Sequence, residues 1–114
     1  MPFPALDPHA SGLLDLDDGT QLYWEESGNA VGKPMIWLHG GPGSGLGAGG
    51  YRRRPDPAVW RIIGIEQRAC GRSRPLVGEP SFDLTALTTE RLIRDIESVR
   101  EFLGIKQWLV AGGS

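Results

Sequence analysis

The chain has 114 residues, of which 39% are hydrophobic and 23% are charged, and its formal net charge is −2. This mixture is that of an ordinary globular domain. No apolar run reaches the roughly 20 residues that a membrane-spanning helix needs. The 12 basic and 14 acidic residues nearly balance, so the charge gives no general attraction for nucleic acid. We therefore expect one domain without membrane or nucleic-acid partners.

The beginning of the sequence and the cysteine content indicate the compartment. Residues 1–10 form a proline-rich lead, and we assign residues 11–114 to the folded domain. The lead has neither the basic flank nor the apolar core of a secretory signal peptide. The single cysteine, Cys70, excludes an internal disulfide framework, and we expect its thiol to be buried core rather than part of a site. These features predict a cytoplasmic protein.

The first half of the domain contains four strand signals. Residues 17–20 are a turn signal between two β-prone runs, residues 12–16 and 21–25, which predicts a hairpin. The apolar runs 35–38 and 60–65 predict strands that are buried on both faces, as in a parallel sheet.

A helix and a last strand follow. Apolar residues recur at helical spacing across residues 87–103, Thr88 or Thr89 can cap the start, and Gly104 lies where a terminating glycine belongs. The apolar run 108–111 predicts a third buried strand. Strands that alternate with a helix indicate an α/β fold with a largely parallel sheet.

Two glycine motifs follow predicted strands and carry the catalytic interpretation. The ending Gly112-Gly113-Ser114 is how a nucleophile elbow, G-x-S-x-G, begins, with Ser114 as the nucleophile. Acyl-transfer hydrolases place an oxyanion-hole loop after another strand, and Gly41, with Gly40 beside it, is the expected donor here. We expect His39 to orient this loop, because the triad histidine of such folds follows the serine in the chain.

The stretch from Glu66 to Ser73 makes a resemblance specific. Together with the His39 loop, the final Gly-Gly-Ser and Leu103-Gly104-Ile105, it resembles the N-terminal part of the proline iminopeptidases, also called prolyl aminopeptidases. The resemblance implies an α/β-hydrolase core, here its N-terminal portion truncated at the elbow, and release of N-terminal proline from small peptides by a serine nucleophile. The triad aspartate and histidine and the cap acids of the family have no counterpart in the sequence. We therefore expect the 114 residues alone to be inactive.

Three positions depart from the usual family pattern. The family usually has Asp-Gln-Arg-Gly where this sequence has Glu66 for the aspartate and Ala69 for the glycine, and Leu87 replaces a common asparagine. If position 69 requires a positive φ, alanine costs about 1 kcal/mol or more there. These departures bear on substrate preference rather than on the fold.

Other interpretations stay open. Other α/β-hydrolases share the loop and the elbow, which leaves an esterase or amidase, and the chain can also be a non-catalytic fragment with the strand at 108–111 as an exposed apolar edge. Residues 45–50 satisfy G-x-G-x-x-G, and Glu66 follows at the spacing of a dinucleotide-binding site. The prolines within residues 54–57 interrupt the helix which that site needs. No P-loop lysine or metal-ligand spacing is present, so we predict neither a cofactor nor a metal.

Overall fold

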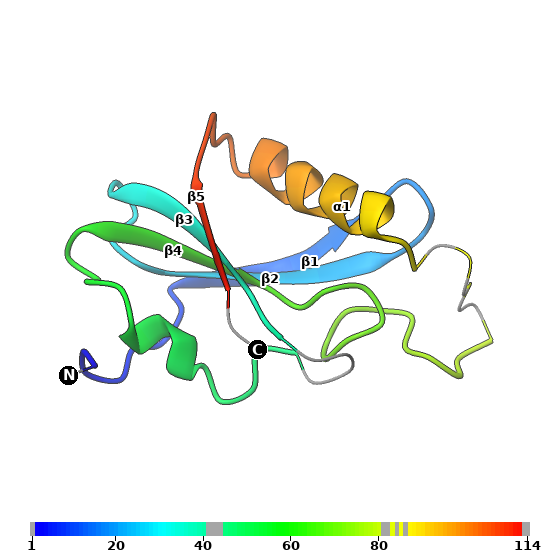
Figure 1. Cartoon of the computed structure of the whole chain (residues 1–114), viewed down its shortest axis with the longest axis horizontal. Helices are drawn as coiled ribbons and strands as arrows, with labels where there is room; N and C mark the ends of the chain where they lie inside the picture. The colour runs from blue at the N-terminus through cyan, green and yellow to red at the C-terminus, as the bar shows by residue number, and fades with distance from the viewer. Residues whose placement is uncertain (1, 41–44, 81–82, 84, 86, 113–114) are drawn as a thin grey trace.

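The computed structural model describes residues 2–40, 45–80, 83, 85 and 87–112, which form a mixed sheet with one α-helix on one face and a short 3-10 helix on the other (Figure 1). The strand order is β1-β2-β4-β3-β5. Neighbouring strands are antiparallel from β1 to β4 and parallel from β4 to β5. The elements are β1 (Ala10–Asp15), β2 (Gln21–Gly28), β3 (Lys33–Leu38), η1 (Gly50–Arg53), β4 (Trp60–Ile65), α1 (Thr89–Phe102) and β5 (Leu109–Gly112).

The predicted hairpin is confirmed in β1 and β2. Asp15 pairs with Gln21 at the end of the hairpin. The turn between them is closed by the Leu16 N–H, which donates to the Thr20 carbonyl at 2.8 Å, and by the Asp18 carboxylate, which accepts from the Thr20 N–H at 3.1 Å. Asp18 therefore stabilises its own turn, as an aspartate in an Asx-turn does.

The two predicted parallel strands are also confirmed. In β3 and β4, Ile36 pairs with Ile63 and Leu38 pairs with Ile65. Successive side chains of a strand point to opposite faces, and here both faces carry apolar residues. Ile36, Ile63 and Ile65 belong to one core cluster, whereas Ile62 belongs to the other. The sheet is therefore buried on both sides at its centre.

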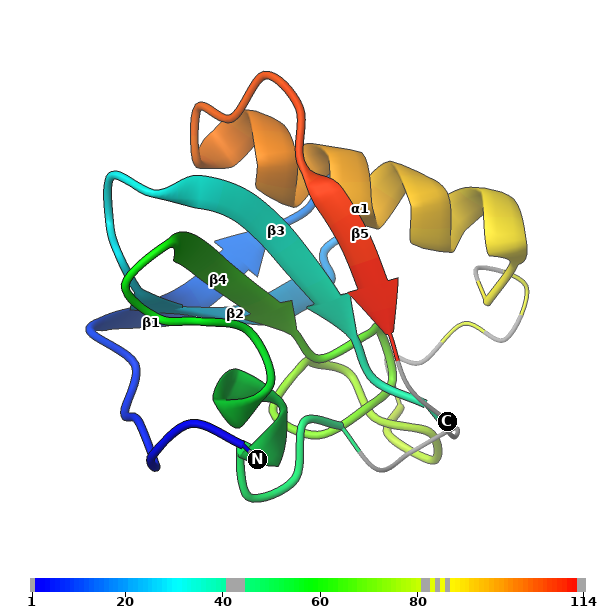
Figure 2. The same ribbon diagram turned by 60° about the vertical axis from the view of Figure 1, so that its left-hand side comes forward.

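The helix α1 covers one face of the sheet and begins and ends where the sequence predicts. The Thr88 hydroxyl accepts from the Arg91 N–H at 3.1 Å, and Gly104 has a φ of +70° just after the helix. Val99, fully buried, packs with Leu22 in the first core cluster. Figure 2 shows the helix lying beside β5 and across the sheet. Neither α1 nor η1 has the length and apolar character that a membrane crossing requires.

A second core lies on the face opposite α1. Its buried members are Met35, Leu46, Tyr51 and Ile62, and the Trp37 ring stacks on Tyr51 with 6.0 Å between centroids. The proline-rich lead contributes Leu6 to this core, and the Phe3 N–H donates to the Arg53 carbonyl at 2.8 Å. The segment from Gly45 to η1 is thus packed against the sheet by aromatic and aliphatic side chains.

The prediction of a third buried strand is wrong for β5. Leu109 is 53% exposed and Val110 is 55% exposed. The reason is position, because β5 ends the strand order and pairs with β3 on one side. Within the described ranges, no further strand or helix covers these two side chains, although Trp108 packs against the first core. The observed apolar edge agrees with the expectation of an exposed strand.

Candidate active site

The carboxyl ends of three strands meet at one edge of the sheet. Leu38 pairs with Ile65 on one side and with Gly112 on the other. His39 therefore leaves the sheet beside Gly112, at the kind of edge where open α/β sheets bind ligands. A side chain at Gly112 would place its Cβ 2.9 Å from the Leu38 carbonyl oxygen, so the two backbones approach too closely for any other residue. The predicted nucleophile, Ser114, and the predicted oxyanion donor, Gly41, lie outside the described residues.

His39 is fixed at the start of the glycine loop by the residue that follows Glu66. Its Nε2 accepts from the Gln67 N–H at 3.0 Å, and its carbonyl accepts from the Gln67 side-chain amide at 2.9 Å. Its Nδ1 lies 3.2 Å from the Gly40 carbonyl. A ring nitrogen that accepts from an N–H carries no proton, so the proton of a neutral imidazole is assigned to Nδ1. This geometry supports an orienting role for His39 rather than a role as base.

Glu66 holds the other end of the same loop. Its Oε2 accepts from the Leu46 N–H at 2.9 Å, and its Oε1 accepts from the Arg72 N–H at 2.8 Å and from Arg72 Nε at 2.6 Å. Gly45 and Gly71 lie against the carboxylate, since a Cβ on either would collide with Glu66 atoms. Burial acts to raise the pKa of Glu66, but the bonds from Arg72 and Leu46 hold that pKa below its ordinary value. Glu66 is therefore charged at neutral pH.

The geometry lacks the helix that the dinucleotide-binding interpretation requires. Gly45, Gly47 and Gly49 all have positive φ, and the segment leads into η1, a 3-10 helix of only 4 residues. A pyrophosphate site of this type uses the N-terminus of a full α-helix. In that interpretation Glu66 would bind the ribose, but its carboxylate already accepts from the backbone N–H groups of Leu46 and Arg72. The spacing of these glycines is therefore a coincidence.

A buried carboxylate on β2 forms a second polar cluster, which the sequence analysis missed. Glu25 is fully buried and accepts from the hydroxyls of Tyr23 at 2.9 Å and Tyr51 at 2.5 Å. Arg52 Nε donates to the same carboxylate at 2.8 Å, and the Arg72 guanidinium lies 3.7 Å from the centre of the Tyr23 ring. Strand alternation offered one signal, because Tyr23 and Glu25 must share a face of β2. The other partners of Glu25, Tyr51 and Arg52, lie 26 and 27 residues away in the sequence.

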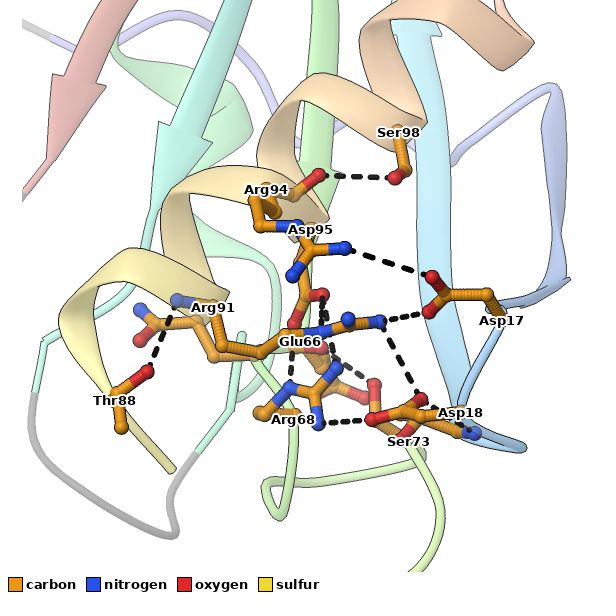
Figure 3. Close-up of polar contacts among 12 residues, drawn as sticks. Asp17, Asp18, Glu66, Arg68, Ser73, Thr88, Arg91, Arg94, Asp95 and Ser98 are labelled. Atoms are coloured by element: carbon orange, nitrogen blue, oxygen red, sulfur yellow. Dashed lines mark hydrogen bonds and ion pairs between the residues drawn. The ribbon is translucent and has the colours of Figure 1, made fainter. Parts of the chain in front are cut away.

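A third cluster joins the loop after β4 to the helix and the hairpin turn (Figure 3). Arg68 donates through Nε and Nη2 to both carboxylate oxygens of Asp95, at 2.7 and 2.9 Å, and through Nη1 to Asp18 at 2.9 Å. Arg91 of α1 donates to Asp17 at 2.5 Å. Burial acts to raise the pKa of Asp18, but the bond from Arg68 holds it well below its ordinary value. These charged pairs thus fix the position of the loop after β4, which lies beside the candidate site.

The same loop contains a strained backbone position. The Cys70 N–H donates to the Gln67 carbonyl at 2.9 Å, and Ala69 within this turn has a φ of 68°. It is the one non-glycine residue with positive φ in the part of the chain that the structure describes. The third residue of a type II turn has this conformation and favours glycine. Position 69 thus has the positive φ on which the cost of alanine depends. Cys70 is buried, at 7% exposed, as expected.

Comparison with known proteins shows which proteins are related to the chain. The sequence matches no family model. It is 46% identical over 112 residues to a probable proline iminopeptidase from Streptomyces coelicolor. The matched region covers 98% of this chain and 34% of that protein. It is also 50% identical over 107 residues to a proline iminopeptidase from Neisseria meningitidis. That match covers 94% of this chain and 33% of the relative. The chain is homologous to the proline iminopeptidases. It spans about a third of the length of these relatives.

Solved structures confirm the predicted α/β-hydrolase fold. A proline iminopeptidase-related protein from Thermus thermophilus has a TM-score of 0.70 and 25% identity, and covers 90% of this chain and 36% of that one. A putative aryl esterase from Burkholderia cenocepacia has a TM-score of 0.75 at 25% identity, and covers 92% of this chain and 37% of that one. Within the described ranges, this proline iminopeptidase homologue has no group of three or more His, Cys, Asp or Glu placed to hold a metal ion.

Proposed function

We propose that this chain supplies the nucleophile and the oxyanion loop of a serine hydrolase of the proline iminopeptidase type, acting on small peptides with an N-terminal proline. The observation that carries the proposal is the pairing of Leu38 with Gly112. It places the strand before Gly41 beside the strand before Ser114, as acyl transfer between a serine and an oxyanion hole requires. The names of the relatives from Streptomyces coelicolor and Neisseria meningitidis support the substrate class.

In this mechanism, Ser114 Oγ attacks the carbonyl carbon of the prolyl residue while its proton passes to a histidine base. The carbonyl oxygen becomes an oxyanion that accepts from the Gly41 N–H, with Gly40 beside it. The C–N bond then breaks, and the leaving amine takes the proton from the base. Water attacks the resulting ester, releases proline and restores the serine hydroxyl.

The base and its acidic partner come from polypeptide outside these 114 residues. The sequence contains two histidines. His9 Nε2 lies 2.8 Å from the Glu26 carboxylate, and His39 Nε2 is occupied by the Gln67 N–H. His9 precedes β1, which lies at the opposite end of the strand order from β5, the strand before Ser114, and protonation of His39 at Nε2 would break its bond to Gln67. We therefore propose that His39 orients the loop and that the 114 residues alone do not hydrolyse peptides.

A chimeric enzyme tests this proposal. In it, the chain replaces the matching residues of the Neisseria meningitidis proline iminopeptidase. We expect the chimeric enzyme to hydrolyse proline p-nitroanilide and Ser114→Ala to lower kcat by at least about 1,000-fold. Ser98→Ala, which changes a helix serine whose hydroxyl donates to the Arg94 carbonyl, is the matched control and should keep full activity. A folded but inactive chimeric enzyme, or an active Ser114→Ala variant, would contradict the proposal.

An esterase is the second candidate function, because the neighbour described as a putative aryl esterase from Burkholderia cenocepacia has the same overall fold. The ratio of kcat/KM for proline p-nitroanilide to that for phenyl acetate separates the two candidates in the chimeric enzyme. A strong preference for the ester would favour the second.

We also propose a cytoplasmic location, which the single cysteine, Cys70, supports. Cell fractionation tests it, and recovery in the secreted fraction would refute it.

A further inference from the structure

The glycine loop of the candidate site is held at both ends by two consecutive residues. Gln67 holds its start through two bonds to His39, one from the backbone and one from the side chain. Glu66 holds its end through the bond from the Leu46 N–H. Because β3 and β4 are parallel neighbours that end at the same level, both contacts form directly beyond the sheet edge.

The two contacts are made from opposite faces of the sheet. Consecutive side chains at the end of a strand point to opposite sides. Gln67 lies on the side of α1, where it lines a cavity of about 200 Å³ together with Leu38 and Ile65. Glu66 lies on the side of the second core, where its partner Leu46 is buried. His39 and Leu46, the described residues at the two ends of the loop, are thus held from opposite sides of the sheet.

We propose that Glu66 and Gln67 are positioning residues for the proposed reaction at Ser114, because they hold Leu46 and His39, the described ends of the predicted oxyanion loop. The inference rests on the proposed function and extends it to residues that do not touch the reacting atoms. The two residues act through the backbone of the loop, one from each end.

The contacts of Glu66 require a carboxylate. Three N–H donors, one from Leu46 and two from Arg72, converge on its two oxygens. A glutamine in its place would aim an N–H₂ group at one set of these donors. Arg72 is itself held by the buried cluster on β2, since it lies over the Tyr23 ring and 3.8 Å from the Glu25 carboxylate. The end of the loop is thus connected through charged contacts to the centre of the sheet.

The test is Glu66→Gln in the chimeric enzyme, compared with Glu26→Gln as the matched control. Glu26 is also a buried glutamate on the sheet, and it bonds Arg61 Nε at 2.9 Å, but it lies away from the loop. Small displacements of catalytic groups cost up to about a hundredfold in rate. We expect Glu66→Gln to lower kcat at least about tenfold with little change in KM, and Glu66→Asp, which keeps the charge, to recover most of it. We expect Glu26→Gln to leave kcat unchanged even where it lowers the melting temperature.

A second variant keeps the proposal testable if Glu66→Gln does not fold. Gln67→Met removes the side-chain donor to the His39 carbonyl and keeps the backbone N–H and the side-chain length. We expect kcat to fall several-fold at unchanged KM. Unchanged kcat in either folded variant, or equal loss in Glu26→Gln, would overturn the positioning role while leaving the proposed function in place. If the chimeric enzyme that carries this chain without any substitution is inactive, that result would instead count against the proposed function itself.

Discussion

Replacing Ala69 by glycine should stabilise the fold, because Ala69 holds a left-handed backbone conformation with a φ of 68°. A Cβ in that conformation costs about 1 to 2 kcal/mol. Glycine avoids this cost but adds unfolded-state freedom worth about 0.4 to 1 kcal/mol. The difference between the midpoints of these two ranges is about 0.8 kcal/mol, so we expect Ala69→Gly to raise the free energy of unfolding by about that amount.

The assay is urea unfolding of the chimeric enzyme, followed by circular dichroism. Ala58→Gly is the matched control, since Ala58 is exposed and is not among the described residues with positive φ. There glycine only adds freedom to the unfolded chain, so stability should fall by about 0.4 to 1 kcal/mol. The two substitutions are thus expected to have opposite signs. Equal destabilisation by both would refute the strain at position 69.

Three further predictions concern the charged cluster and the helix start. Asp95→Ala leaves a buried arginine without its main partner and should cost about 3 kcal/mol in urea unfolding, whereas Asp17→Ala, at an exposed carboxylate, should cost little. Thr88→Ala removes the helix cap and should cost about 1 kcal/mol, with Thr89→Ala near zero as its control. The pKa of Asp18 is lowered in the folded state, so its stabilisation is present above its unfolded pKa, near 4, and is lost as the pH falls. Unfolding at pH 7 and pH 3 should therefore show a smaller pH effect in Asp18→Asn than in the native sequence, and an equal effect would contradict this assignment.

Local features of the sequence predicted most of the secondary structure. Thr88 and Gly104 mark the helix ends because capping and a left-handed glycine are properties of a few adjacent residues. The strands at 35–38 and 60–65 were recognisable because a sheet covered on both faces selects uninterrupted apolar runs. The order of the strands, with β4 between β2 and β3, depends on contacts between distant segments and carries no such local signature.

The polar clusters could not be predicted for the same reason, and the sequence left open whether the strand at 108–111 is buried or exposed. Arg68 and Asp95 are 27 residues apart, and Glu25 and Arg52 are also 27 apart, so no helical or strand spacing relates them. The apolar run in β5 indicates that its side chains favour burial but not which neighbour would cover them. The catalytic interpretation came from glycine spacing and family resemblance, whereas the contacts of Gln67 became visible only in three dimensions.

The two departures from the usual proline iminopeptidase pattern near the site act on different quantities. Ala69 affects stability, because its strain is confined to one backbone position in the turn closed by Cys70. Glu66 affects the position of the residues that contact it, because its charged carboxylate accepts from three N–H donors and fills the space beside Gly45. Nothing in the structure explains Leu87, which is 43% exposed. Relieving the strain at Ala69 removes no acceptor from the loop, so stability and the position of the loop can vary separately in this protein.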